Sequence, residues 1–316
     1  MEAPVAGNRV AELLVLGQSE QMHVTPRPGA DRDNLLSTLR SLHDEVLDRR
    51  REVGAGPAQN LIGSYLEWAA NAVRRLDNQV APRDIDRLLL TRGYDRLLAA
   101  IGLPGTDTTT QRVLNGLVGL ELGQRAQAFK AAAKTLEAQI KRWPLTCAFV
   151  VPDTSFFIEH EDKLEEADLQ SLLGLPGMPV HALVPIVVVD ELDGLKKSKH
   201  KDARWRAPYT LAVLDRVLAN SGGGATVGTL IPPGQGGGCT VEIVFDPPGH
   251  VRLPINDDEL IDRILAIQPL ASRSVTLLTY DTGQSTRARA AGLPVKKLTK
   301  TYDMPAGTAN GNSSAG

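Results

Sequence analysis

The sequence predicts an α/β fold in which an all-helical N-terminal domain precedes a parallel sheet flanked by helices. Three observations support this. The chain has 316 residues, which is long enough for two domains. Apolar residues recur at helical spacing up to about residue 145. Beyond that point, short apolar runs that end in acidic residues alternate with helical stretches, which is typical of a parallel sheet with crossover helices.

Stripes of apolar side chains at helical spacing predict the helices of the N-terminal half. Glycine- and proline-containing breaks at 54–57, Pro82 and 103–108 separate the helices. We expect a helical domain over residues 1–145 that serves oligomerisation, substrate presentation or partner binding. The stripes are Leu35, Leu36, Leu39, Leu42 and Val46, then Leu61, Tyr65, Trp68, Ala72 and Leu76, then a region from about 109 to 140.

The C-terminal half, residues 146–304, is expected to hold the sheet. Strands are predicted at 146–153, 180–192 and 273–281, and helices at 204–218 and 258–270. The glycine-rich stretch 221–238 is expected to be an inserted loop, and 241–253 a hairpin with a Pro-Pro-Gly turn. Residues 305–316 are expected to form a disordered tail.

Composition excludes several classes of protein. No stretch is apolar enough to predict a transmembrane helix, and the N-terminus is a poor secretory signal, so a cytoplasmic location and no membrane partner are expected. Two cysteines are too few for a disulfide framework. With 35 Lys and Arg against 37 Asp and Glu, nucleic-acid binding would require a local basic patch.

Acidic residues follow the predicted strands. Asp153, Glu191 and Asp281 stand at strand ends, and a fourth acid, Asp258, opens the helix before the last strand. The carboxyl ends of parallel strands form the functional edge of an open sheet. Clustered carboxylates need a cation, and oxygen ligands suit Mg²⁺ or Mn²⁺, which predicts phosphodiester hydrolysis. The alternative for each acid taken alone is a turn or helix cap.

Four stretches together resemble the PIN domain family of metal-dependent ribonucleases, over about residues 146–300. They are VPDTSFFI (151–158), VVVDELDGLKKS (187–198), NDDELIDRILA (256–266) and LLTYDTGQSTRARAAGLPV (277–295). The resemblance implies helices around a parallel sheet and an acidic pocket for Mg²⁺ or Mn²⁺.

By position, the resemblance makes Asp153, Glu191 and Asp281 the first, second and last acids of that pocket. The third is Asp257, Asp258 or Asp262, with Asp258 fitting the family pattern best. The hydroxyl groups expected to support the acids are those of Thr154, Ser155 and Thr279.

A basic segment follows Glu191 directly and predicts a track for the RNA backbone. Trp205 would stack on an unpaired base, which favours a single-stranded substrate. The alternatives are a solvated loop for the lysines and a core position for Trp205. The residues expected to bind nucleic acid are Lys196, Lys197, Lys199, Lys201, Arg204, Trp205, Arg206 and Arg287.

The leading hypothesis is an endoribonuclease that uses a carboxylate-bound Mg²⁺ or Mn²⁺ ion and an activated water on single-stranded RNA. The alternatives are a non-catalytic RNA- or protein-binding module and the toxin of a toxin–antitoxin pair. A homo-oligomer or a protein partner would use the N-terminal helices. The six histidines form no HxxxH or HExxH pair, which argues against a zinc hydrolase.

Overall fold

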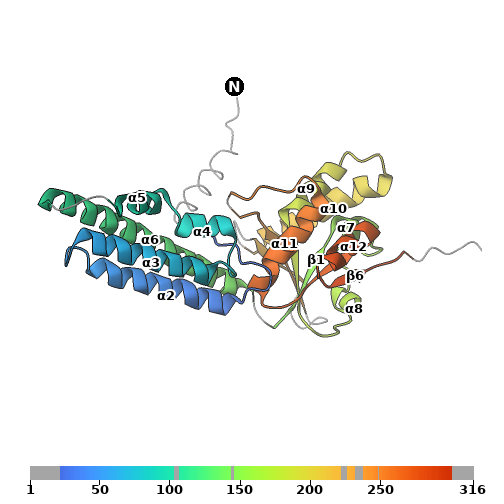
Figure 1. Ribbon diagram of the computed structural model, residues 1–316. Helices are drawn as coiled ribbons and strands as arrows, with labels where there is room; N and C mark the ends of the chain where they lie inside the picture. Colours follow the sequence, from blue (N-terminus) through green and yellow to red (C-terminus); the bar gives the residue numbers. More distant parts are fainter. Residues whose placement is uncertain are drawn as a thin grey trace, which may run out of the picture. The chain divides into compact units, whose positions relative to one another are not determined.

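The computed structural model describes residues 22–102, 107–143, 146–221, 226–231, 238–247 and 249–300 (Figure 1). The expected tail at 305–316 lies outside these ranges. The elements in chain order are α2 (Arg32–Arg51), α3 (Ala58–Leu76), α4 (Pro82–Leu88), α5 (Arg92–Ala100), α6 (Thr108–Arg142), β1 (Ala148–Pro152), α7 (Thr154–Glu159), α8 (Leu169–Leu173), β2 (Val180–Pro185), α9 (Ile186–Leu195), α10 (Lys201–Ala219), β3 (Val227–Ile231), β4 (Cys239–Val244), α11 (Asn256–Ala271), β5 (Val275–Thr279), α12 (Thr282–Ala290) and β6 (Val295–Lys297).

The chain divides into two compact units. Residues 1–149 and 245–275 form one, which we call the helical unit, and residues 150–244 and 276–316 form the other, the sheet unit. The return of 245–275 to the N-terminal helices was not predicted from the pattern along the chain. Long-range hydrogen bonds explain it, since the buried Arg32 of α2 donates to Leu270 O at 2.6 Å, and Arg83 of α4 donates to Gly249 O at 3.4 Å.

The helical unit confirms the predicted N-terminal helices. Asp31 caps α2 by accepting from Asn34 N, and Asp107 caps α6 by accepting from Thr109 N and Thr110 N. The stripes of α2 and α3 point inward as expected. Trp68 of α3 lies edge-on to Phe129 of α6, with ring centroids 6.0 Å apart.

One buried ion pair sits inside this apolar packing. Arg125 Nε lies 3.0 Å from Glu121 Oε1 on the same face of α6, and both side chains are less than 10% exposed. The Tyr65 hydroxyl donates to the same Glu121 oxygen at 3.1 Å, and Arg125 donates to Leu88 O at 2.7 Å. The pair therefore links α3 and α4 to α6.

The sheet has six strands in the order β3-β4-β2-β1-β5-β6 and is mostly parallel. Strand β2 runs parallel to β4, from Val180 opposite Cys239 to Pro185 opposite Val244, and β5 runs parallel to β6. Strand β3 pairs with β4 in the antiparallel direction at one edge. The predicted α/β class is therefore confirmed, with helices beside the sheet.

Three local predictions were wrong. The run 180–192 is not one strand, because β2 ends at Pro185 and the valine-rich continuation forms α9. The hairpin expected over 241–253 is absent from the described residues there, since β4 ends at Val244 and no strand follows before α11. The antiparallel partner of β4 is instead β3, which lies within the stretch expected to be a glycine-rich loop.

Gly228 shows why β3 can form there. A Cβ at this position would lie 2.5 Å from Val217 O, so only glycine lets the strand approach the backbone of α10 so closely. None of the helices in the described ranges has the length and apolar character needed to cross a membrane.

Candidate active site

Asp153 lies directly after β1 and is the N-cap of α7. Its Oδ1 atom accepts from Phe156 N at 2.9 Å and from Ser155 Oγ at 2.7 Å. Its Oδ2 atom accepts from the Thr279 hydroxyl. The residue is only 5% exposed, so these donors fix the carboxylate in one orientation at the end of the strand.

Strands β1 and β5 bring the hydroxyl groups to this carboxylate. Asp153 N donates to Leu278 O at 3.0 Å, which places the next residue of β5, the fully buried Thr279, beside Asp153. Ser155 Oγ lies 3.2 Å from Thr279 Oγ1 and accepts from Tyr280 N at 2.8 Å. The predicted supporting hydroxyls of Ser155 and Thr279 thus form one network with Asp153.

Two further predicted acids lie in the same unit. Asp281 caps α12 by accepting from Gln284 N at 2.8 Å, and its own N–H donates to Thr279 Oγ1 at 2.8 Å. Glu191 is carried by α9, and its Oε2 atom accepts from the Thr154 hydroxyl. Each acid is therefore joined by a hydroxyl or a backbone group to the turn that follows β1 or β5.

Burial raises the pKa of Asp153 to about 6. The hydrogen bonds from Thr279, Ser155 and Phe156 N oppose the rise, and the charge of Asp281 adds to it. A carboxylate that is buried next to another acid, with no cationic partner among these contacts, is suited to a bound cation. The oxygen-only donor set fits Mg²⁺ or Mn²⁺.

A comparison with models of protein families identifies the segment that carries Asp153, Glu191 and Asp281. Residues 150–299 match the family model described as the PIN domain. They form a PIN domain. PIN domains are commonly nucleases and typically use divalent metal ions. No curated protein matches the chain.

The matched segment of the PIN domain contains all the predicted acids, and the third remains a choice among neighbours on α11. Asp257 and Asp258 lie in the first turn of that helix, and both are partly exposed. Asp262 lies about one turn later and is paired with Arg263. Helix α11 groups with the helical unit, so the assignment of Asp258 stays a prediction.

The predicted basic segment lies at the end of α9 and the start of α10. Its lysines are exposed, and Lys196 is paired with Asp193 at 2.6 Å. Arg204 is exposed as well, and Arg287 is exposed in the last turn of α12. Arg206 has a structural part, because its guanidinium donates to the carbonyls of Glu161 and Asp162.

Trp205 is not a core residue. It is 54% exposed and stacks on Tyr209, one turn along α10, with ring centroids 5.4 Å apart and an interplanar angle of 18°. The Arg206 guanidinium lies 5.8 Å from the Trp205 ring centroid. The exposed Trp205 ring, which stacks on the half-buried Tyr209 beside a guanidinium, is a surface on which an unpaired base can stack.

Sequence reasoning missed a pair of side chains beside the acids. His160 ends α7, stacks on Phe156 and lies with Nδ1 2.9 Å from the Tyr280 hydroxyl. Tyr280 stands between Thr279 and Asp281, so this contact ties α7 to the turn that carries the last acid. The two residues are 120 positions apart, and neither belongs to a motif that would predict their contact.

Proposed function

We propose that the PIN domain hydrolyses phosphodiester bonds of single-stranded RNA, using a divalent ion bound by the acids of the sheet unit, Asp153, Glu191 and Asp281. The family resemblance adds Asp258 as the predicted third acid. The observation that supports this most strongly is the setting of Asp153. It is a buried carboxylate at a strand end, oriented by two hydroxyls and a backbone N–H, and destabilised in its charged form by burial and by Asp281.

The protein's own residues would hold the ligand atoms in position. Thr279 and Ser155 fix both oxygens of Asp153, and Thr154 fixes one oxygen of Glu191. A bound Mg²⁺ or Mn²⁺ would supply positive charge to the phosphate oxygens and lower the pKa of a water molecule. Oxygen ligands oriented in advance reduce the reorganisation that the reaction requires.

The exposed lysines and Trp205 support single-stranded RNA as the substrate. Lysine side chains attract the phosphate backbone without reading sequence, and an aromatic platform binds any unpaired base. The end of α9, the connection 196–200 and the start of α10 lie between Glu191 and Trp205, so the platform follows the acid along the chain. A duplex would present no free base face to this ring.

The test is cleavage of an end-labelled single-stranded RNA by the full-length protein, with Mn²⁺, Mg²⁺ or EDTA. We expect metal-dependent cleavage that is lost in Asp153→Asn and in Asp281→Asn. The matched control is Asp107→Asn, the same change at an exposed N-cap of the helical unit, which should cleave normally. Cleavage by Asp153→Asn at the unmodified rate would refute the assignment.

The third acid is tested by three single variants. We expect Asp258→Asn to lose cleavage, while Asp257→Asn and Asp262→Asn retain most of it. Loss in Asp262→Asn alone would move the assignment one turn along α11; this variant also removes one of the two carboxylates paired with Arg263.

A second candidate function is RNA binding without cleavage, which the exposed Trp205 ring, stacked on Tyr209, favours. Tight binding of single-stranded RNA together with no cleavage at millimolar Mn²⁺ would support this function over hydrolysis. Growth arrest on expression would instead support the toxin alternative.

A further inference from the structure

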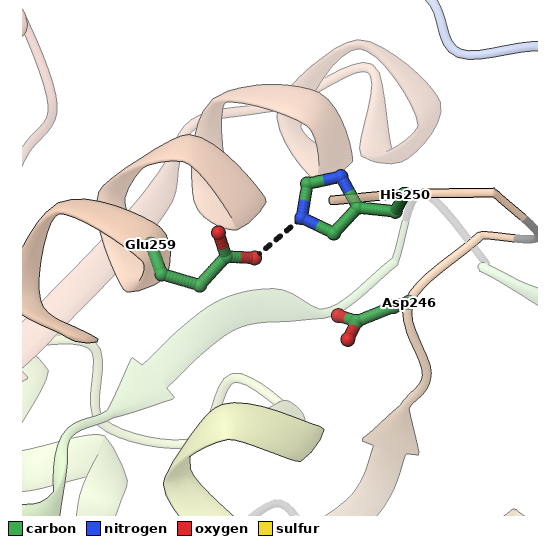
Figure 2. A group of neighbouring side chains, drawn as sticks. All are labelled: Asp246, His250 and Glu259. Carbon is green, nitrogen blue, oxygen red and sulfur yellow. Dashed lines mark hydrogen bonds and ion pairs between the residues drawn. The ribbon is translucent and has the colours of Figure 1, made fainter. Parts of the chain in front are cut away.

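A second group of metal-ligating side chains lies in the helical unit and shares no residue with the acids discussed above. It comprises Asp246, His250 and Glu259, each of which offers one ligand atom within 4.8 Å of the others (Figure 2). Asp246 and His250 come from the segment between β4 and α11, and Glu259 comes from the first turn of α11.

Glu259 is the fixed point of this group. Its side chain is fully buried, Oε1 lies 2.7 Å from His250 Nε2, and Oε2 accepts from Leu253 N at 2.8 Å. A turn holds the backbone of His250, since its backbone N–H donates to Pro247 O at 3.0 Å. The imidazole and the carboxylate therefore have little freedom to move apart.

Asp246 completes the group with an oxygen that lacks a donor. One of its oxygens accepts from Arg252 Nε at 2.6 Å, while Oδ1 is shielded from solvent and has no hydrogen-bond partner. In Figure 2 the Asp246 carboxylate points toward the His250–Glu259 pair. A carboxylate oxygen shielded from solvent without a partner destabilises the fold, and a cation at this point would offset that cost.

The ion pairs around Asp246 and Glu259 form a network whose net negative charge favours a bound cation. Three carboxylates face two guanidiniums, so the network carries a net charge of −1 when His250 is neutral (−3 + 2). The carboxylates are those of Asp246, Glu259 and Asp262, and the guanidiniums are those of Arg252 and Arg263.

We propose that Asp246, His250 and Glu259 bind a divalent transition-metal ion of the Zn²⁺ type. The donor set of one imidazole nitrogen and two carboxylates favours Zn²⁺ over Mg²⁺, which prefers oxygen ligands and retains its water. His250 would bind through Nε2 with its proton on Nδ1, and three protein ligands leave a coordination position for water. The inference does not depend on the proposed nuclease activity.

The test is calorimetric titration of ZnCl₂ into the full-length protein carrying Asp153→Asn and Asp281→Asn, which weakens metal binding by the PIN-domain acids. We expect one site that a large excess of Mg²⁺ does not displace. Adding His250→Ala or Asp246→Asn should weaken Zn²⁺ binding about tenfold or more. The matched control is His43→Ala, which removes another carboxylate-paired histidine of the helical unit and should leave binding unchanged.

The proposal has a second readout that needs no variant at the site. The X-ray absorption spectrum of the bound Zn²⁺ should show one imidazole among oxygen ligands. An absence of Zn²⁺ binding, a spectrum without imidazole, or binding that survives both His250→Ala and Asp246→Asn would each overturn it. If His250→Ala fails to fold, the proposal is tested by Asp246→Asn, a change at a partly exposed residue, and by the absorption spectrum.

Discussion

Replacing Asp153 by Asn should stabilise the metal-free protein while removing its proposed activity. The amide keeps the shape of the carboxylate. Its oxygen can accept from Ser155 Oγ and Phe156 N as Oδ1 does now, and its NH₂ group can donate to Thr279 Oγ1. The substitution therefore removes the charge with little change in packing.

The magnitude follows from the pKa of Asp153, which is about 6 in the folded protein against an ordinary value of 3.8. A difference of about 2 pK units corresponds to about 3 kcal/mol. Between about pH 4 and pH 6 the folded state binds more protons than the unfolded state, so the free energy of unfolding falls as pH rises through this window. Above it, the ionised carboxylate destabilises the fold by a constant amount.

The assay is urea unfolding followed by circular dichroism at pH 4.5 and pH 7.5, both in EDTA. We expect the free energy of unfolding of Asp153→Asn to exceed that of the unmodified protein by about 1–3 kcal/mol at pH 7.5, with a smaller difference at pH 4.5. Mn²⁺ should reverse the order, because an ion that binds the folded state stabilises the unmodified protein more.

The control for this experiment is Asp107→Asn. The hydrogen bond from the Thr110 hydroxyl holds the pKa of Asp107 below its ordinary value, so this charge favours the folded state and its removal should bring no gain at pH 7.5. The reasoning would be refuted if Asp153→Asn were less stable than the unmodified protein at pH 7.5 in EDTA, or if its effect were the same at both pH values.

The remaining predictions concern other parts of the chain. Thr279→Val should lower RNA cleavage about 10- to 100-fold, because Asp153 loses a hydroxyl that orients it, and binding of RNA measured by fluorescence anisotropy should stay within a factor of two or so. Trp205→Ala should weaken single-stranded RNA binding by about 1–3 kcal/mol without loss of thermal stability, since the ring is exposed; an unchanged dissociation constant would exclude the platform. Glu121→Ala should cost about 3–5 kcal/mol in urea unfolding by leaving the buried Arg125 unpaired, and a loss below about 1 kcal/mol would contradict the buried network. Burial raises the pKa of Cys239 to about 12, so alkylation by iodoacetamide at pH 8 should begin only when urea unfolds the protein.

The acids after β1 and β5 could be predicted from the sequence because each follows a short apolar run. Asp153 and Asp281 stand where a parallel strand ends, and both prove to be N-caps of the next helix as well. The cap, which was the alternative for each acid alone, and the candidate site are therefore the same structure. Thr279 was predicted from the family resemblance, two residues before Asp281, and it proves to be the last residue of β5.

The boundary between β2 and α9 was not predicted, because the residues that follow Pro185 have a high strand propensity. Ile186 to Val189 are β-branched and favour a strand, yet they form the first turn of a helix. Pro185 carries the missed signal, because proline lacks a backbone donor and rarely continues a central strand. As a result Glu191 projects from a helix rather than from a strand end.

The sequence by itself determined the helical stripes, most of the alternation of strands and helices, and the position of Asp153 and Asp281 after strands, because periodicity and strand ends are local properties. Tertiary structure decided the grouping of 245–275 with the helices, since Arg32 and Arg83 make hydrogen bonds across long separations. It also decided the meeting of His250 with Asp246 and Glu259. The grouping depends on a turn and on burial, and neither property can be predicted from the spacing of the three residues.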